Sequence, residues 1–170
     1  MKYDYKTLYE KNATFLKAVP LRKRLIQAID MAVTLFVMIA YLCLIMHAIN
    51  AKIPTTDFVA LLFVPFLGLF IATVLQIAID RPRPFSESGA AITPMYKRSG
   101  DGKSFPSRHM TSAFVIATVC LPHLPAFGAV LYVLSLFLGY ARFSLGWHYP
   151  SDLFAGAGLG VGIGCLIFFL

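Results

Sequence analysis

Charge is scarce in this sequence of 170 residues: Asp, Glu, Lys and Arg together make up 14%, whereas soluble domains carry about 25%. Hydrophobic residues make up 58%, and the mean hydropathy is +0.73. So few charges exclude a coiled coil, and so many apolar residues exclude a disordered chain. The same balance disfavours a water-soluble domain, and we therefore predict an integral membrane protein.

Cysteine is also scarce. The three cysteines, Cys43, Cys120 and Cys165, all lie within apolar stretches, and no C-x-x-C spacing occurs. This distribution argues against a disulfide framework and against a cysteine metal site, so we interpret all three as small buried hydrophobic residues. A cleavable signal peptide is not predicted, because the basic N-terminus precedes an apolar stretch that is too long for one.

Apolar stretches of the length that crosses a bilayer, about 20 residues, dominate the rest of the chain. Five occur, the third of them short: residues 25–49, 58–79, 107–121, 126–145 and 151–170. Residues 1–24 form a basic segment in which aromatic residues and leucines are mixed with lysines, a pattern that fits an amphipathic helix at a membrane interface. We predict an all-α bundle of about five transmembrane helices over residues 25–170, with a polar loop at residues 80–107.

Positive charge gives the predicted bundle an orientation. Of the fifteen Lys and Arg residues, seven fall within residues 1–24, which favours a cytoplasmic N-terminus. Because successive spans cross the membrane in opposite directions, residues 80–107 and residues 142–152 are then predicted to lie on the cytoplasmic side as well. The cations flank apolar stretches and line no soluble face, so we expect anionic lipid head groups or a phosphorylated substrate as partners, and no nucleic acid.

Glycines recur in the last apolar stretch. Gly156, Gly160 and Gly164 share one face of the predicted helix, and small residues at this spacing allow two helix backbones to approach closely. We predict that this face packs against another helix, and a homodimer through the same face is the alternative.

Ionisable residues gather at the ends of the predicted spans, where their cost makes each of them a candidate functional residue. Three such clusters are predicted to share one membrane face: residues 80–84, residues 106–109 and residues 142–152. Arginines occur in all three and suit bidentate binding of phosphate oxygens. In the first cluster, we interpret Asp80 and Arg81 as a local ion pair.

The other residues of these clusters fit phosphoryl transfer. A helix that begins at Ser107 points free backbone N–H groups at an anion, although the Ser107 hydroxyl also suits a helix cap. His109 and His148 allow one imidazole to attack phosphorus while the other protonates the leaving oxygen. Asp152 lies four residues after His148 and could hold its tautomer. The clusters lack the several carboxylates of a magnesium site, so we predict transfer through a phosphohistidine with no metal and no cofactor.

At these residues the sequence resembles the phosphatidic-acid-phosphatase type 2 superfamily of membrane phosphatases, which shares its site with the vanadium haloperoxidases. That family carries the motifs K-x6-R-P, P-S-G-H and S-R-x5-H-x3-D. The corresponding segments here are Gln76-x6-Arg83-Pro84, Pro106-Ser107-Arg108-His109 and Ala141-Arg142-x5-His148-x3-Asp152. Their order and spacing make the resemblance specific.

The resemblance implies a role for each candidate residue. His148 would be the nucleophile, Asp152 its orienting partner and His109 the general acid. The phosphoryl oxygens would be held by Arg83, Arg142 and Ser107, with Arg108 and Gln76 beside them.

A lipid phosphatase of a bacterial plasma membrane is the activity that the resemblance implies. The charge distribution favours a catalytic face toward the cytoplasm; the alternative, with residues 1–24 outside the cell, is a catalytic face that is turned outward. Candidate substrates are a polyprenyl pyrophosphate such as undecaprenyl pyrophosphate, phosphatidylglycerol phosphate and phosphatidic acid. One alternative is a phosphotransferase that uses a lipid pyrophosphate. Another is a non-catalytic lipid-binding protein with a decayed site.

Three departures from the motifs bear on the site. Gln76 stands where the family has lysine, Arg108 stands where it has glycine, and Ala141 stands where it has serine. The last change removes a hydrogen-bonding group but no charge. The first two offset each other in charge, so we interpret Arg108 as the source of the charge that Gln76 lacks.

This offset predicts the effect of a substitution. Replacing Arg108 by glycine should cost far more activity than replacing a surface arginine, because the phosphate would lose one of its cations. Phosphate release by the purified variants measures the difference. Wild-type rates in Arg108→Gly would refute the offset.

Overall fold

The computed structural model describes residues 5–86, 88–96 and 102–170. Its helices are α1 (Tyr5–Lys17), α2 (Pro20–Asn50), α3 (Thr55–Ile79), α4 (Arg108–Cys120), α5 (Pro125–Ser144) and α6 (Pro150–Gly164), followed by a short 3₁₀ helix, η1 (Cys165–Phe168). These described ranges contain no strand, and the predicted all-α class is confirmed.

Proline marks the beginning of three helices. Pro20, Pro125 and Pro150 lie in the first turns of α2, α5 and α6, where the fixed φ of proline suits the helix and its missing N–H has no helical partner to lose. At its other end, α3 stops at Ile79, and Asp80 adopts the left-handed conformation with a φ of 50°. The chain therefore leaves the bundle at the point where the predicted polar loop begins.

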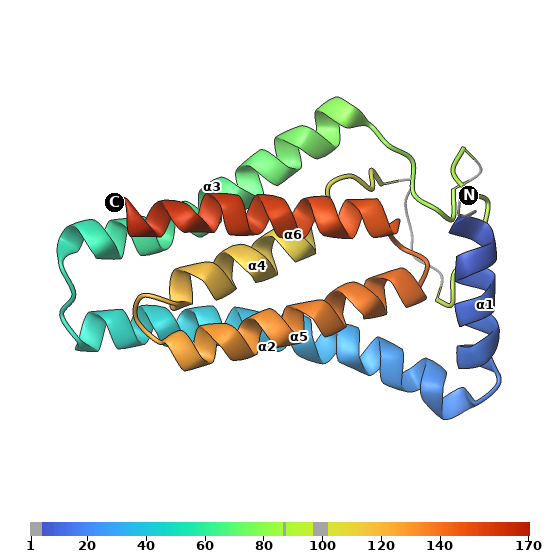
Figure 1. Cartoon of the computed structure of the whole chain (residues 1–170), viewed down its shortest axis with the longest axis horizontal. Helices are drawn as coiled ribbons and strands as arrows, with labels where there is room; N and C mark the ends of the chain where they lie inside the picture. Colours follow the sequence, from blue (N-terminus) through green and yellow to red (C-terminus); the bar gives the residue numbers. More distant parts are fainter. Residues whose placement is uncertain (1–4, 87, 97–101) are drawn as a thin grey trace.

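Four helices run along the length of the molecule. Figure 1 shows α2, α3, α5 and α6 lying lengthwise, with α1 across one end. Each of the four, α6 together with η1, is long and apolar enough to cross a membrane. By contrast α4 has 13 residues, which span about 20 Å, and it packs against α2, α3, α5 and α6. The third predicted stretch is therefore a short helix in the interior of the bundle.

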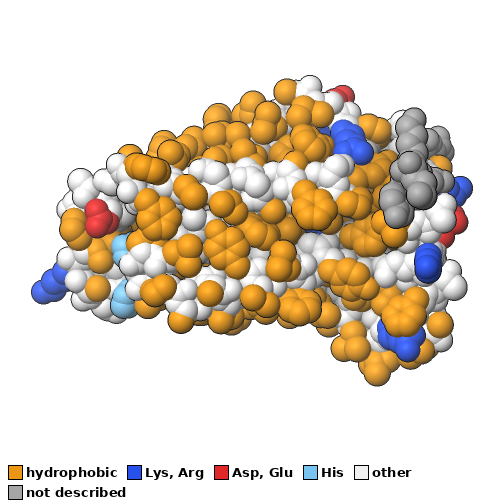
Figure 2. Space-filling view, viewed as in Figure 1, with side chains coloured by type: hydrophobic (Ala, Val, Ile, Leu, Met, Phe, Trp, Pro, Cys, Tyr) orange, Lys and Arg blue, Asp and Glu red, His pale blue; other side chains and the backbone are white. Residues whose placement is uncertain are grey.

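Side chains on the outside of the bundle are largely apolar. Figure 2 shows hydrophobic side chains over the middle of the face in view, and Lys and Arg near its ends. Phe154 and Phe66 are 79% and 64% exposed. Contiguous apolar surface of this extent is unfavourable in water, whereas it matches lipid chains. The outer faces fit a multi-pass membrane protein.

The predicted N-terminal helix is present as α1, and α2 begins before the predicted boundary, at Pro20. The inner face of α1 packs on the protein itself: it forms a buried cluster of Tyr9, Ala13, Leu16, Ile26, Ile92, Met95, Ala141 and Leu145. Contact of its outer face with lipid head groups stays a prediction. Figure 1 shows α1 at the same end of the bundle as the described parts of the loop between α3 and α4, as alternate crossings predict.

The glycine face of α6 packs against α4, which confirms the predicted close approach of two helices. A Cβ atom at Gly156 would lie 2.6 Å from the Ser107 carbonyl oxygen, and one at Gly160 would lie 2.6 Å from that of Thr111. Only glycine permits these contacts. The alternative, a homodimer through Gly156, Gly160 and Gly164, is wrong, because α4 of the same chain covers this face.

Gly160 and Gly158 offer a matched test of this packing, since a Cβ atom at Gly158 meets nothing within 4 Å. We expect Gly160→Ala to lower the free energy of unfolding by about 1–3 kcal/mol through overpacking. Gly158→Ala should leave it unchanged or raise it by up to about 1 kcal/mol. Thermal unfolding of the purified proteins in detergent compares the two. Equal midpoints would show that α6 does not need glycine where it meets α4.

Candidate functional site

The three predicted clusters meet at one end of the bundle. Nη1 of Arg83 donates to the Trp147 carbonyl over 3.2 Å and lies 3.5 Å from Nε2 of His148. The Ser107 N–H donates to the Asp152 carbonyl over 3.0 Å. These contacts join the loop after α3, the start of α4 and the start of α6 into one site.

His148 lies at the centre of this site and is 1% exposed. Its Nδ1 lies 3.0 Å from the Ser104 carbonyl oxygen and 3.6 Å from Oδ2 of Asp152. Because a carbonyl only accepts hydrogen bonds, Nδ1 carries the proton and the lone pair of the neutral ring is on Nε2. The nitrogen that faces Arg83 is therefore the one able to act as a nucleophile.

Burial lowers the pKa of His148 from 6.5 to about 4. The hydrogen bond and charge of Asp152 act in the opposite direction and raise this pKa, while the positive charges of Arg83 and Arg142 lower it further. Removing an imidazolium from water is unfavourable, so the ring is neutral at pH 7. It keeps the lone pair that attack on phosphorus needs.

Asp152 is fully buried in the first turn of α6, and both of its carboxylate oxygens are engaged. Oδ2 accepts a hydrogen bond from the Tyr149 N–H over 2.9 Å, and Oδ1 accepts one from Nη1 of Arg81 over 2.8 Å. The Ser104 carbonyl is closer to Nδ1 of His148 than Asp152 is. Asp152 thus stands behind the imidazole as a neighbouring negative charge, and the nearer hydrogen-bond acceptor is the main chain.

Arg142 and Arg83 are both buried, but they are held by different groups. Arg142 forms an ion pair with Asp30 of α2, with 2.8 Å between Nε and Oδ1 and 3.3 Å between Nη2 and Oδ2. Arg83 donates to main-chain oxygens, from Nε to Gly102 over 2.9 Å and from Nη1 to Trp147. Both guanidinium groups are therefore fixed before any phosphate binds.

Ser107 supplies a hydroxyl that has no hydrogen-bond partner within the described part of the chain, although it is fully buried. Ser107 directly precedes α4, yet its hydroxyl does not cap that helix. A buried polar group without a partner is costly, and the first turn of α4 also presents backbone N–H groups that no carbonyl within the helix accepts, together with the positive end of the helix dipole. Together these donors form a site suited to an anion.

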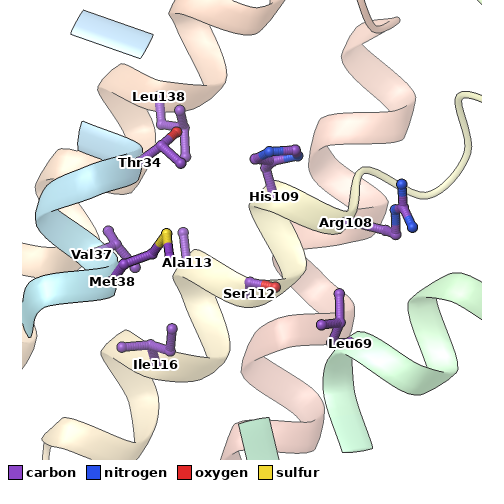
Figure 3. Close-up of a pocket in the computed structure, with 10 residues that line it drawn as sticks. All are labelled: Thr34, Val37, Met38, Leu69, Arg108, His109, Ser112, Ala113, Ile116 and Leu138. Atoms are coloured by element: carbon purple, nitrogen blue, oxygen red, sulfur yellow. The ribbon is translucent and has the colours of Figure 1, made fainter. Parts of the chain in front are cut away.

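Gln76 and Arg108 replace the usual residues of the first two motifs. Gln76 is buried, and its Nε2 donates to the Pro106 carbonyl over 2.8 Å. Its side chain therefore holds the segment that leads into α4, where the sequence predicts a contact with phosphate. Arg108 is exposed at the start of α4, and Figure 3 shows its side chain and that of His109 leaving the helix in different directions. That Arg108 supplies the positive charge that Gln76 lacks stays a prediction.

An apolar groove begins at His109. It has a volume of about 260 Å³ and is lined by residues of α2, α3, α4 and α5, among them Thr34, Met38 and Leu69 (Figure 3). A second groove of about 280 Å³ is lined by α1, α4, α5 and α6 and includes Phe154. Of these two grooves, only the first has a histidine in its wall.

The motifs do not predict Asp30 as the partner of Arg142, nor Arg81 as the partner of Asp152. Asp30 interrupts an apolar stretch, and a carboxylate at such a position is the signal that could have identified it as the partner of Arg142.

The predicted ion pair between Asp80 and Arg81 is wrong: Asp80 pairs with Lys103 over 3.1 Å, and Arg81 pairs with Asp152. In the ranges that the structure describes, no three His, Cys, Asp or Glu side chains come together as a metal site would require.

These features define a helical membrane protein in which three segments rich in histidine and arginine meet at one end of the bundle. The chain belongs to the PAP2 superfamily, whose sequence model matches residues 57–170.

Relatives and solved structures agree with this membership. The chain is 36% identical over 101 residues to the lipid A 1-phosphatase of Rhizobium etli, covering 57% of this chain and 42% of that protein. It is 31% identical over 101 residues to the undecaprenyl-diphosphatase BcrC of Bacillus subtilis, covering 59% of this chain and 51% of that protein. The aligned regions thus span about half of these relatives or less.

Two crystal structures share the fold. A transmembrane PAP2 type phosphatidylglycerolphosphate phosphatase from Bacillus subtilis superposes with a TM-score of 0.67 and 23% identity, over 96% of this chain and 85% of that one. LpxE from Aquifex aeolicus superposes with a TM-score of 0.66 and 23% identity, over 99% and 98%. At this identity the likeness establishes the fold.

The burial of His148 has a measurable consequence. We expect its imidazole to stay neutral until the pH falls to about 4, whereas an unfolded histidine titrates near 6.5. Since only the unfolded chain takes up this proton between the two values, the free energy of unfolding should decrease as the pH falls from 6.5 toward 4. Spectra of the ¹⁵N-labelled ring nitrogens, assigned with His148→Ala, follow the titration. A midpoint near 6.5 would contradict the buried neutral ring.

Proposed function

We propose that this protein is a membrane lipid phosphatase that hydrolyses a phosphomonoester or pyrophosphate on a lipid, through a phosphohistidine and without a metal. The observation that carries the proposal is the arrangement of its two histidines. His148 is buried with Nε2 beside Arg83, and His109 lies in the wall of an apolar groove. In this proposal one imidazole attacks phosphorus, and the other protonates a lipid oxygen.

The phosphoryl group would be bound by the anion site. Arg83, the Ser107 hydroxyl and the N–H groups at the start of α4 offer donors to its three non-bridging oxygens. Arg142 adds positive charge while it remains paired with Asp30. All of these groups are already oriented by the protein, so little reorganisation would accompany the change in charge at phosphorus.

The reaction would then proceed in two displacements. The lone pair on Nε2 of His148 attacks phosphorus, and the bond to the leaving oxygen breaks as His109 donates a proton to it. Nδ1 keeps its proton, and the Ser104 carbonyl and Asp152 stabilise the positive ring. In the second step His109 takes a proton from water, the water oxygen attacks phosphorus and the P–N bond breaks. Inorganic phosphate leaves, and both histidines return to their starting states.

The groove beside His109 supports a lipid as the leaving group. In an in-line displacement the leaving oxygen lies opposite the nucleophile, and its general acid must be within hydrogen-bonding distance. The lipid chain would therefore occupy the groove that contains His109, between α2, α3, α4 and α5, and not the groove lined by Phe154. Most of the exposed wall of the first groove is apolar, with Arg108 and His109 at the start of α4 also lining it, which suits a hydrocarbon chain with a charged head.

The names of the relatives support lipid-linked phosphates as the substrate class, since they describe a lipid A 1-phosphatase and an undecaprenyl-diphosphatase. Undecaprenyl pyrophosphate, phosphatidylglycerol phosphate, phosphatidic acid and lipid A are the compounds to compare. A phosphotransferase with the same site would need a second acceptor, and a non-catalytic lipid-binding protein would need no pair of histidines.

Phosphate release by the purified protein in detergent with excess EDTA tests this function. We expect release from at least one of these lipids, loss of it by at least about 100-fold in His148→Ala, and no effect of EDTA. His123→Ala is the matched control, because His123 lies in the connection between α4 and α5 and should retain wild-type activity.

The other outcomes have clear meanings. Loss of activity in EDTA would overturn the metal-free mechanism. Phosphate transfer that depends on an added acceptor would identify a phosphotransferase. Lipid binding without turnover, unchanged in His148→Ala, would identify a non-catalytic protein.

We further propose that the site faces the cytoplasm of a bacterial cell, because the basic N-terminal segment lies at the same end of the bundle as the site. Single cysteines at Lys11 and Lys52, in a chain without its native cysteines, test the orientation. We expect a membrane-impermeant thiol reagent to label position 52 in intact cells and position 11 only after lysis. Labelling of position 11 in intact cells would turn the site outward.

A further inference from the structure

The side chain of Arg81 reaches the first turn of α6. Its Nη1 donates to Oδ1 of Asp152 over 2.8 Å and to Oγ of Ser151 over 2.7 Å. The guanidinium also lies 4.1 Å from the centroid of the Tyr149 ring, at a distance typical of a cation–π contact. The Arg81 side chain is 35% exposed, whereas that of Asp152 is fully buried. Arg81 therefore stands between the Asp152 carboxylate and solvent.

The main chain of Arg81 reaches the other partner of His148. Its carbonyl accepts hydrogen bonds from the Ser104 N–H over 2.9 Å and from the Ser104 hydroxyl over 3.2 Å. The Ser104 carbonyl in turn lies 3.0 Å from Nδ1 of His148. One residue thus holds both groups that face Nδ1: Ser104 through its main chain, and Asp152 through its side chain.

The sequence explains how Arg81 and Arg83 both reach the surroundings of the His148 imidazole. Each of them precedes a proline, in Arg81-Pro82-Arg83-Pro84, and a residue before proline is restricted to extended conformations. In extended backbone, the side chains of residues two apart point to the same side of the chain. Arg83 contacts the Nε2 side of His148, and Arg81 contacts the carboxylate behind its Nδ1 side.

We propose that Arg81 is a positioning residue for the nucleophile: it fixes Asp152 through its side chain and Ser104 through its main chain, so that both groups facing Nδ1 keep their places and Nε2 points at the phosphate. Arg81 acts through these two groups and does not bind the substrate. Removing its side chain frees Oδ1 of Asp152, and a carboxylate is a stronger acceptor than a carbonyl. The carboxylate would then lose one of its fixed partners and could turn, and the imidazole that it faces would lose its fixed orientation.

The charges around His148 predict how its pKa responds to the loss of Arg81. Arg83 from the loop after α3, Arg142 from α5 and Asp152 from α6 act on the ring, and Tyr5 of α1 lies near enough to Asp152 to sense its charge. Arg83 and Arg142 lower the pKa of His148, and Asp152 raises it. An Asp152 released from Arg81 would raise the pKa of His148, because its negative charge would no longer be balanced by the Arg81 guanidinium.

Kinetics of Arg81→Gln, Arg81→Lys and Lys103→Gln test the inference, which rests on the proposed function for this readout. Lys103 is the matched control, since its side chain is also 35% exposed and pairs with Asp80 in the same loop. We expect Arg81→Gln to lower kcat about tenfold with KM within about twofold of wild type. Arg81→Lys, which keeps the charge, should restore most of kcat, and Lys103→Gln should match wild type.

Spectra of the ¹⁵N-labelled histidine ring in the same variants test the inference without a substrate. We expect the titration midpoint of His148 to rise in Arg81→Gln, and to stay at the wild-type value in Lys103→Gln. A higher KM with unchanged kcat in Arg81→Gln would make Arg81 a substrate-binding residue and overturn the proposal. An unchanged His148 midpoint would overturn it as well. A wild-type protein that releases no phosphate would refute the proposed function and leave the spectroscopic test intact.

Discussion

The close contact between α4 and α6 is the constraint on which the site depends. At Gly156 the two backbones approach so closely that a Cβ atom would collide with the Ser107 carbonyl oxygen. The same approach allows the Ser107 N–H to donate to the Asp152 carbonyl. In the proposed function Ser107 begins the phosphate site and Asp152 stands behind the nucleophile, so helix packing would set the distance between the phosphate donors and His148. A bulkier residue on this face of α6 would separate them.

Two arginines at this end of the bundle are held in ion pairs, whereas Arg83 is held by main-chain oxygens. Burying a charge is unfavourable unless an opposite charge accompanies it: Asp30 accompanies the buried Arg142, and Arg81 accompanies the buried Asp152. The two pairs differ in place: the first joins α2 to α5, and the second joins the loop after α3 to α6. Both tie the ends of distant helices together. The arginines are consequently oriented in the free protein, which is the preorganisation that binding a charged group requires.

The shortness of α4 explains how a polar site and an apolar groove can adjoin. A helix of 13 residues does not reach across a bilayer, which needs about 20, so its first turn lies inside the bundle. His109, in that turn, lies in the wall of the groove that runs along α4. A substrate with a charged head and an apolar chain matches this change in polarity over a single helical turn.

Sequence alone determined the all-α class, the position of the long helices and the meeting of the three motifs at one end. These follow from the length of apolar stretches and from the alternation of crossings, which need no side-chain detail. Only the tertiary structure decided that Asp30 pairs with Arg142, that Arg81 pairs with Asp152, that Ser104 faces His148, and that the glycines of α6 meet α4 of their own chain. The reason is physical: in a membrane protein the buried and lipid-facing sides of a helix are both apolar, so hydrophobic periodicity does not fix its rotation. Side-chain partners depend on that rotation.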